Sequence, residues 1–157
     1  YWYFFNRELS GFGQPPIKAC HFIRELRFSP EELEVLAVLE QNRHSIFEFI
    51  KLKDKTLHIK DLIRKDKIIV KDSPWTFGFE GGEFFEARLV RWKEEWIFTK
   101  GFCFHPGEAK KFILIEVKKY QKNPDLDVED FLLRLAKKRF KLDQYKHVKP
   151  ELIYAQI

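Results

Sequence analysis

The stretch SIFEFIKLK (residues 45–53) decides the fold, because its side chains alternate between two faces. Ile46, Ile50 and Leu52 fall on one face, whereas Phe47 and Phe49 fall on the other. A period of two residues is the pattern of a β-strand. The polar pair at 54–55 then predicts a turn, and a second strand is predicted over 56–62.

Three more strands are predicted on the C-terminal side of this hairpin. They cover residues 67–71, 83–92 and 96–104, and polar turns at 64–66 and 93–95 separate them from their neighbours. Short consecutive antiparallel strands favour a barrel, since closure hides edges that otherwise template aggregation. We therefore predict an α+β fold with a small five-stranded antiparallel β-barrel, SH3-like or OB-like, over residues 45–105.

Helices are predicted on both sides of the barrel. A first short helix is expected over 16–27, and a second over 30–42, where Ser29, Pro30 and Glu32 form a capping-box signature. The apolar stripe expected to face inward on the second helix consists of Leu33, Leu36, Ala37 and Leu39. The aromatic opening at residues 1–5 is expected to pack as a strand or an anchor.

The C-terminal third is predicted to be helical and basic. Helices are expected over 107–120, from the cap Asp127 to about residue 146, and over 150–154. The whole chain, 1–157, is then a single domain with a helical part (1–44), a barrel (45–105) and a basic helical part (106–157). Whether the basic helices bind anything is left open.

Composition restricts the class of protein. The 157 residues are 45% hydrophobic with a net charge of +5, which favours a folded protein over a disordered one. Two cysteines are too few for a secreted disulfide scaffold, and no apolar run is long enough for a membrane span, so we expect a cytoplasmic protein. Because the chain opens on Tyr1, we expect it to be a piece of a longer protein. The oligomeric state is left open.

The loop at 72–82 is rich in aromatic residues and glycine. In small barrels, aromatic side chains beside positive charge form stacking surfaces for single strands or peptides. We therefore predict a non-enzymatic interaction module that binds protein or RNA through this loop and the barrel mouth. The predicted binding residues are Lys71, Trp75, Phe77, Phe79, Arg88, Trp92 and Trp96. The alternative use of these aromatic side chains is to seal an open end of the barrel.

A second hypothesis places a pocket beside the barrel at Glu86, Arg88, Cys103 and His105, which indicates an enzyme or an enzyme accessory domain. Cys20-His21 and Cys103 with His105 also offer the ligand types of a zinc site. Adjacent residues on a helix point in different directions, however, so we expect no metal and no cofactor.

Six segments together carry a family resemblance: WYFFNR (2–7), FIREL (22–26), SPEE (29–32), SIFEF (45–49), IKDL (59–62) and EARLV (86–90). In order and spacing they resemble a poorly characterised group of bacterial proteins that often carry a SEC-C motif, over residues 2–105. The SEC-C motif is a cysteine-rich zinc hairpin, and nothing in this chain matches it. The resemblance implies an intact domain and no particular activity.

Overall fold

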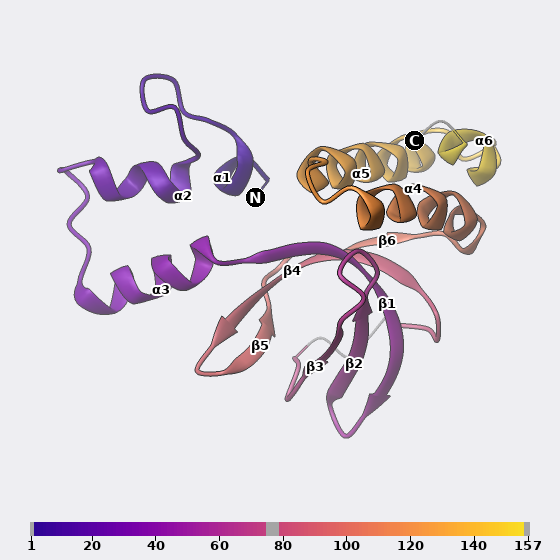
Figure 1. Cartoon of the computed structure of the whole chain (residues 1–157), viewed down its shortest axis with the longest axis horizontal. Helices are drawn as coiled ribbons and strands as arrows, with labels where there is room; N and C mark the ends of the chain where they lie inside the picture. The colour runs from indigo at the N-terminus through magenta and orange to yellow at the C-terminus, as the bar shows by residue number, and fades with distance from the viewer. Residues whose placement is uncertain (1, 75–78, 156–157) are drawn as a thin grey trace.

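The computed structural model describes residues 2–74 and 79–155 of the chain. Figure 1 shows a curled sheet with helices at both ends of the chain. The strands are β1 (Arg43–Lys53), β2 (Thr56–Asp61), β3 (Lys67–Val70), β4 (Phe84–Trp92), β5 (Glu95–Phe98) and β6 (Cys103–His105). The α-helices are α1 (Trp2–Asn6), α2 (Pro16–Ala19), α3 (Pro30–Glu40), α4 (Lys110–Lys122), α5 (Val128–Gln144) and α6 (Pro150–Tyr154), and short 3₁₀ turns cover Cys20–Phe22 and Gly107–Ala109.

The strands form an antiparallel half-barrel in the order β3-β2-β1-β4-β5, with β6 paired to β4 off this path. The predicted α+β class and antiparallel sheet are confirmed, but the closed barrel is wrong. Across the described residues β3 and β5 are not paired, although the edges approach closely enough for Lys71 Nζ to donate to Glu95 Oε1 at 3.2 Å. The strand predicted over 96–104 is in fact two strands, β5 and β6, with Gly101 at a positive φ of 108° between them.

Local geometry explains the curl. The predicted turn at Asp54 and Lys55 is confirmed, and both residues have positive φ, 48° and 61°, as a tight turn between twisted strands requires. The pairing of β1 with β2 shifts register between Phe49 and Lys51. Such an irregularity bends a strand and increases its twist, so the sheet folds round its own concave face.

Two hydrophobic cores lie on opposite faces of the sheet. The concave core is formed by alternate residues such as Phe47, Phe85 and Leu89. The convex core lies between the sheet and helices α4, α5 and α6, and Ile46 and Phe84 reach it from the strands. Every residue of β4 from Phe84 to Val90 is therefore buried.

The C-terminal helices confirm their sequence pattern. The Asp127 side chain accepts from the backbone N–H groups of Glu129 and Asp130 and thereby caps α5. Apolar residues of this region face inward: Ala109, Ile113, Tyr120, Phe131, Leu132 and Leu135 are buried, and Phe112 and Leu142 pack against the same core.

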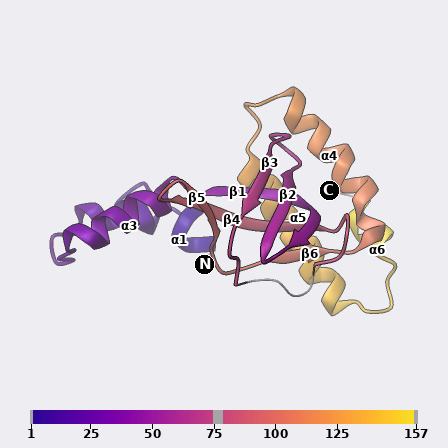
Figure 2. The ribbon, with the colours of Figure 1, turned by 90° about the horizontal axis from the view of Figure 1, so that it is seen from below.

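The N-terminal helices differ more from expectation. The capping box at Ser29 and Glu32 is present, and α3 begins at Pro30 as predicted. The helix predicted over 16–27 ends at Ala19 followed by one 3₁₀ turn, and the opening aromatic segment is the short helix α1 rather than a strand. The inward stripe predicted on α3 is wrong. Figure 2 shows α3 projecting away from the sheet and from α4, α5 and α6, and none of its residues, all of which the structure describes, is buried.

No helix within the described ranges 2–74 and 79–155 has both the length and the apolar character that crossing a membrane demands.

Asp61, at the end of β2, is a buried carboxylate on which a stability prediction rests. It accepts from Ser45 Oγ and from the backbone N–H groups of Ile63 and Arg64, at 2.8 to 2.9 Å. It also pairs with the Arg43 and Arg64 guanidinium groups at 3.2 and 3.3 Å.

We predict that Asp61→Ala lowers the free energy of unfolding by about 3 kcal/mol, because the change leaves buried donors without an acceptor. The matched variant Asp66→Ala removes a carboxylate that is 54% exposed and also pairs with Arg43, so its effect should stay below about 1 kcal/mol. Urea unfolding followed by tryptophan fluorescence measures both variants. Equal losses in the two would contradict the role given to Asp61.

Candidate functional site

Two charged side chains, Glu86 and Arg88, lie on the convex face of β4 and are only 5% and 3% exposed. The alternation of the strand places them there, since the residues that alternate with them, Phe85, Ala87 and Leu89, face the concave core. A buried charge is stable only when it is paired or hydrogen-bonded. The partners of these two residues therefore define the site.

Glu86 is the first member of a buried hydrogen-bonded chain that ends at Tyr154. His105 on β6 places Nε2 at 2.9 Å from Glu86 Oε1 and Nδ1 at 2.9 Å from the Tyr154 hydroxyl on α6. An ionised carboxylate only accepts hydrogen bonds, so Nε2 of His105 carries a proton and donates a hydrogen bond to Glu86. In the neutral imidazole Nδ1 then accepts from the tyrosine hydroxyl. This chain fixes both the plane and the tautomer of His105.

Cys103 lies beside this chain, because β6 pairs with β4 in a register that sets Cys103 opposite Glu86. The thiol Sγ, a carboxylate oxygen of Glu86 and a ring nitrogen of His105 all lie within 4.8 Å of one another. Burial, and next the charge of Glu86, raises the pKa of the Cys103 thiol to about 12. Burial also raises the pKa of the Tyr154 hydroxyl. At neutral pH Cys103 is therefore a protonated thiol and not an activated nucleophile.

Arg88 is held by a second network that joins distant parts of the chain. Its guanidinium donates to the side chains of Asn6, Asn42 and Glu129, and it lies over the Phe5 ring at 4.7 Å from the centroid. These partners come from α1, from the segment before β1, and from α5.

Glu129 is shared between Arg88 and His44, whose Nδ1 lies 2.7 Å from Oε2. Burial acts to raise the pKa of the Glu129 carboxyl. The hydrogen bond from His44 and the charges of His44 and Arg88 outweigh burial, so this pKa is lowered. Glu129 therefore stays ionised and neutralises Arg88.

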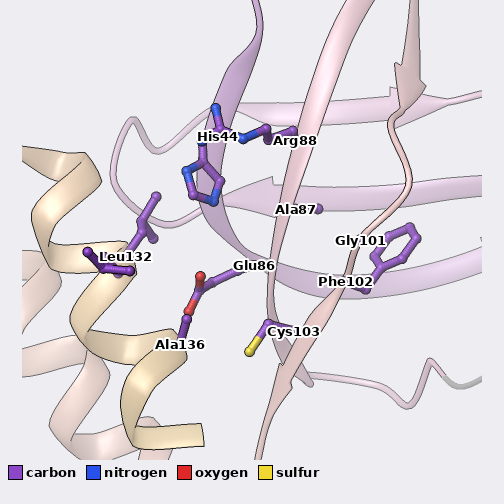
Figure 3. A pocket seen from close by; sticks show the side chains of 10 residues that line it. His44, Glu86, Ala87, Arg88, Gly101, Phe102, Cys103, Leu132 and Ala136 are labelled. Carbon is purple, nitrogen blue, oxygen red and sulfur yellow. The ribbon is translucent and has the colours of Figure 1, made fainter. Parts of the chain in front are cut away.

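A cavity of about 220 Å³ lies between β4, β6 and α5. Figure 3 shows the Glu86 carboxylate and the Cys103 thiol both pointing toward α5. The polar residues that line the cavity are His44, Glu86, Arg88 and Cys103, and helix α5 contributes Leu132, Leu133 and Ala136. The structure thus brings together three of the four residues of the second sequence hypothesis in one cavity, with His105 directly behind it.

The predicted aromatic binding residues do not share one environment. Phe79 packs into the concave core, stacked on Phe49 at 5.2 Å and edge-on to Phe85 at 5.2 Å. This is the position expected of a side chain that seals the open end of the half-barrel.

The remaining predicted binding residues are half-buried, paired with other side chains, or on the other face of the sheet. Trp92 and Trp96 are half-buried, with Lys93 and Arg43 over their rings. Lys71 pairs with Glu95, whereas Arg88 lies on the opposite face of the sheet. Trp75 and Phe77 fall outside the described residues. Binding of protein or RNA through this set stays a prediction.

Several residues that complete the site have no local signal in the sequence. His44, Glu129 and Tyr154 come from β1, α5 and α6, and Tyr154 is 49 residues from the histidine that it contacts. Cys20 and His21, which the sequence offered as ligands, are not in the cluster, and His21 pairs instead with Glu40 of α3.

Comparison with known proteins assigns the chain to one family. A family described as "Family of unknown function (DUF7986)" matches residues 20–148, which is most of the chain, and the chain belongs to this family. No curated protein matches the chain, and no solved structure matches it. The resemblance to proteins with a SEC-C motif stays a prediction.

The two cysteines provide a test of the electrostatics at the site. Only the thiolate reacts with iodoacetamide, so we expect Cys103 to be alkylated at least about tenfold more slowly than Cys20 at pH 8 in the presence of a chelator. Burial raises the pKa of Cys20 as well, but less severely. Because the pKa of Cys103 is about 12, its rate should rise about tenfold for each pH unit between 7 and 10. Mass spectrometry of Cys20→Ser and Cys103→Ser measures the two rates separately; a fast Cys103 at pH 7 would contradict the stated protonation.

Proposed function

We propose that this domain binds a transition-metal ion of the zinc type through Glu86, Cys103 and His105. The observation that supports it is the convergence of three different ligand types within 4.8 Å of one another, two of them on the wall of a cavity. Thiolate, imidazole and carboxylate are the three side-chain ligands that zinc takes in proteins. The carboxylate of Glu86, which the cysteine and histidine pattern alone did not include, completes the set.

The dimensions of the cluster suit a single small ion. Ligands at zinc lie about 2.0 to 2.3 Å from the metal, which places them about 3 to 4 Å from one another. His105 Nε2 and Glu86 Oε1 are already 2.9 Å apart, so a small side-chain adjustment brings the three atoms around one centre.

Tyr154 would orient the histidine ligand. When Nε2 of His105 binds a metal, the ring proton moves to Nδ1, which then donates to the Tyr154 oxygen 2.9 Å away. A hydrogen bond from the second ring nitrogen is the usual support of a metal-bound histidine. The Cys103 thiol gives up its proton to the solvent as the metal binds.

Three protein ligands would leave one position open on a tetrahedral ion, and two of these ligands, Glu86 and Cys103, line the cavity shared with Arg88 and Leu132. Open sites of this kind hold water or a small ligand, whereas closed four-ligand sites are structural. The proposed site thus develops the sequence hypothesis of an enzyme or an enzyme accessory domain at Glu86, Arg88, Cys103 and His105.

Cobalt is a suitable probe because its bond to a thiolate is visible. Titration of the full chain with Co²⁺ should give a thiolate-to-cobalt charge-transfer band at one ion per chain, and Zn²⁺ should abolish that band by competition. Cys103→Ser should lose the band, whereas the matched variant Cys20→Ser should keep it. Tyr154→Phe should keep the band with an affinity about 10- to 100-fold lower.

Circular dichroism of each variant without metal establishes that it is folded. A folded wild-type chain with no charge-transfer band, or a band of unchanged intensity in Cys103→Ser, would disprove the proposed metal site.

A second candidate function, interaction with protein, is favoured by a separate observation. Helix α3 has no buried residue although it is rich in leucine and valine.

A further inference from the structure

Helix α3 carries apolar side chains on all sides, and none of its residues is fully buried, although three of its apolar residues are half-buried. Its sequence, PEELEVLAVLE, spreads leucine, valine and alanine round the helix, and Leu33 and Val35 are 42% and 44% exposed. In the segment that leads to it, Phe22 and Leu26 are 67% and 45% exposed. A helix that is hydrophobic all round is normally buried in an assembled protein. The arm formed by residues 20–41 therefore has the composition of a segment that another surface covers.

A complementary surface lies on the outer side of α5. This helix buries Phe131 and Leu135 against the sheet, but it also carries a second apolar stripe on its opposite side. That stripe forms a groove lined by Leu133, Ala136, Lys137, Phe140, Lys141 and Tyr145. Phe140 is 65% exposed and Tyr145 is 53% exposed. An adjoining groove toward α6 shares Lys141 and Tyr145 and adds Leu152, which is 70% exposed.

The two surfaces carry opposite charges. Helix α3 contains only acidic ionisable residues, Glu31, Glu32, Glu34 and Glu40. The α5 surface is basic and includes Lys137, Lys138 and Lys141. Opposite potentials of this kind select partners and fix register at an interface.

The arm does not cover the groove of its own chain. Figures 1 and 2 both show α3 on one side of the sheet and α5 set apart from it. Helix α1 lies nearer, and its Tyr3, with Arg7 just after the helix, borders the Leu133 end of the α5 stripe. The Phe140 and Tyr145 end is left open.

We propose that the chain forms a two-fold dimer by arm exchange, in which the acidic apolar helix α3 of each copy lies in the basic apolar groove of α5 of the other. This proposal rests on the protein-interaction function and does not depend on the metal site. Reciprocal exchange uses both surfaces twice and leaves neither exposed, as a closed symmetric dimer requires. The partner is thus a second copy of the chain, held by leucine and phenylalanine contacts and ordered by glutamate-lysine pairs.

Sedimentation velocity of the full chain in the presence of a chelator tests the proposal. We expect a concentration-dependent species of twice the 19.0 kDa chain mass. Leu33→Asp and Phe140→Asp each place a charge in the interface at an exposed position, so each should raise the dissociation constant of the dimer at least tenfold without unfolding the chain. Ile115→Asp is the matched control, since Ile115 is 48% exposed on α4, outside both surfaces, and its dimer should be unchanged.

A charge exchange provides the decisive measurement. One variant carries Glu31→Lys, Glu34→Lys and Glu40→Lys in the arm, and the other carries Lys137→Glu, Lys138→Glu and Lys141→Glu in the groove. Each alone should be monomeric, because its arm and groove have the same sign. Mixed in equal amounts, they should form a heterodimer, because each arm then meets a groove of opposite sign.

A wild-type chain that stays monomeric at millimolar concentration would overturn the proposal. So would a dimer that survives both Leu33→Asp and Phe140→Asp, or a mixture of the two charge variants that stays monomeric. Because a chelator is present throughout, none of these results bears on the metal site.

Discussion

The burial of two opposite charges on one face of β4 is the constraint on which the arrangement of the chain depends. Glu86 and Arg88 are both nearly inaccessible, and neither can stay charged there without partners. Glu86 finds its partner on β6, which in turn bonds to α6, and Arg88 finds partners near the N-terminus and on α5. The two side chains thus fix the positions of elements that come from opposite ends of the sequence.

Local sequence patterns predicted the local structure correctly. The alternation of residues 45–53, the tight turn at Asp54 and Lys55 and the capping box at Ser29 are each set by interactions within a few residues, and all are present. Closure of the sheet is different, because it depends on how far a bulge near Ile50 and the break at Gly101 bend the strands. The alternation of a strand does not contain that information, so the expected barrel is a half-barrel.

The candidate site was predicted only in part, because local patterns do not contain long-range packing. Strand alternation was enough to place Glu86 and Arg88 on one face, and the short spacing of Cys103 and His105 placed them on one segment. The contacts from Tyr154, Glu129 and His44 depend on long-range packing of α5 and α6 against the sheet. A hydrophobic pattern reports which face of a helix is buried, but not which strand residue it meets.

The prediction for α3 shows that apolar residues at helical spacing do not distinguish an interface from a core. Its Leu33, Leu36 and Leu39 were expected to face inward, and leucine at helical spacing does indicate burial. A sequence cannot distinguish burial within one chain from burial against another, since both remove the same apolar area from water. In this chain α3 stands apart from both cores, while α5 carries a second apolar stripe that no described element fills completely. Two unfilled surfaces of opposite charge in one chain are explained together by a partner that has both, and a second copy of the chain is such a partner.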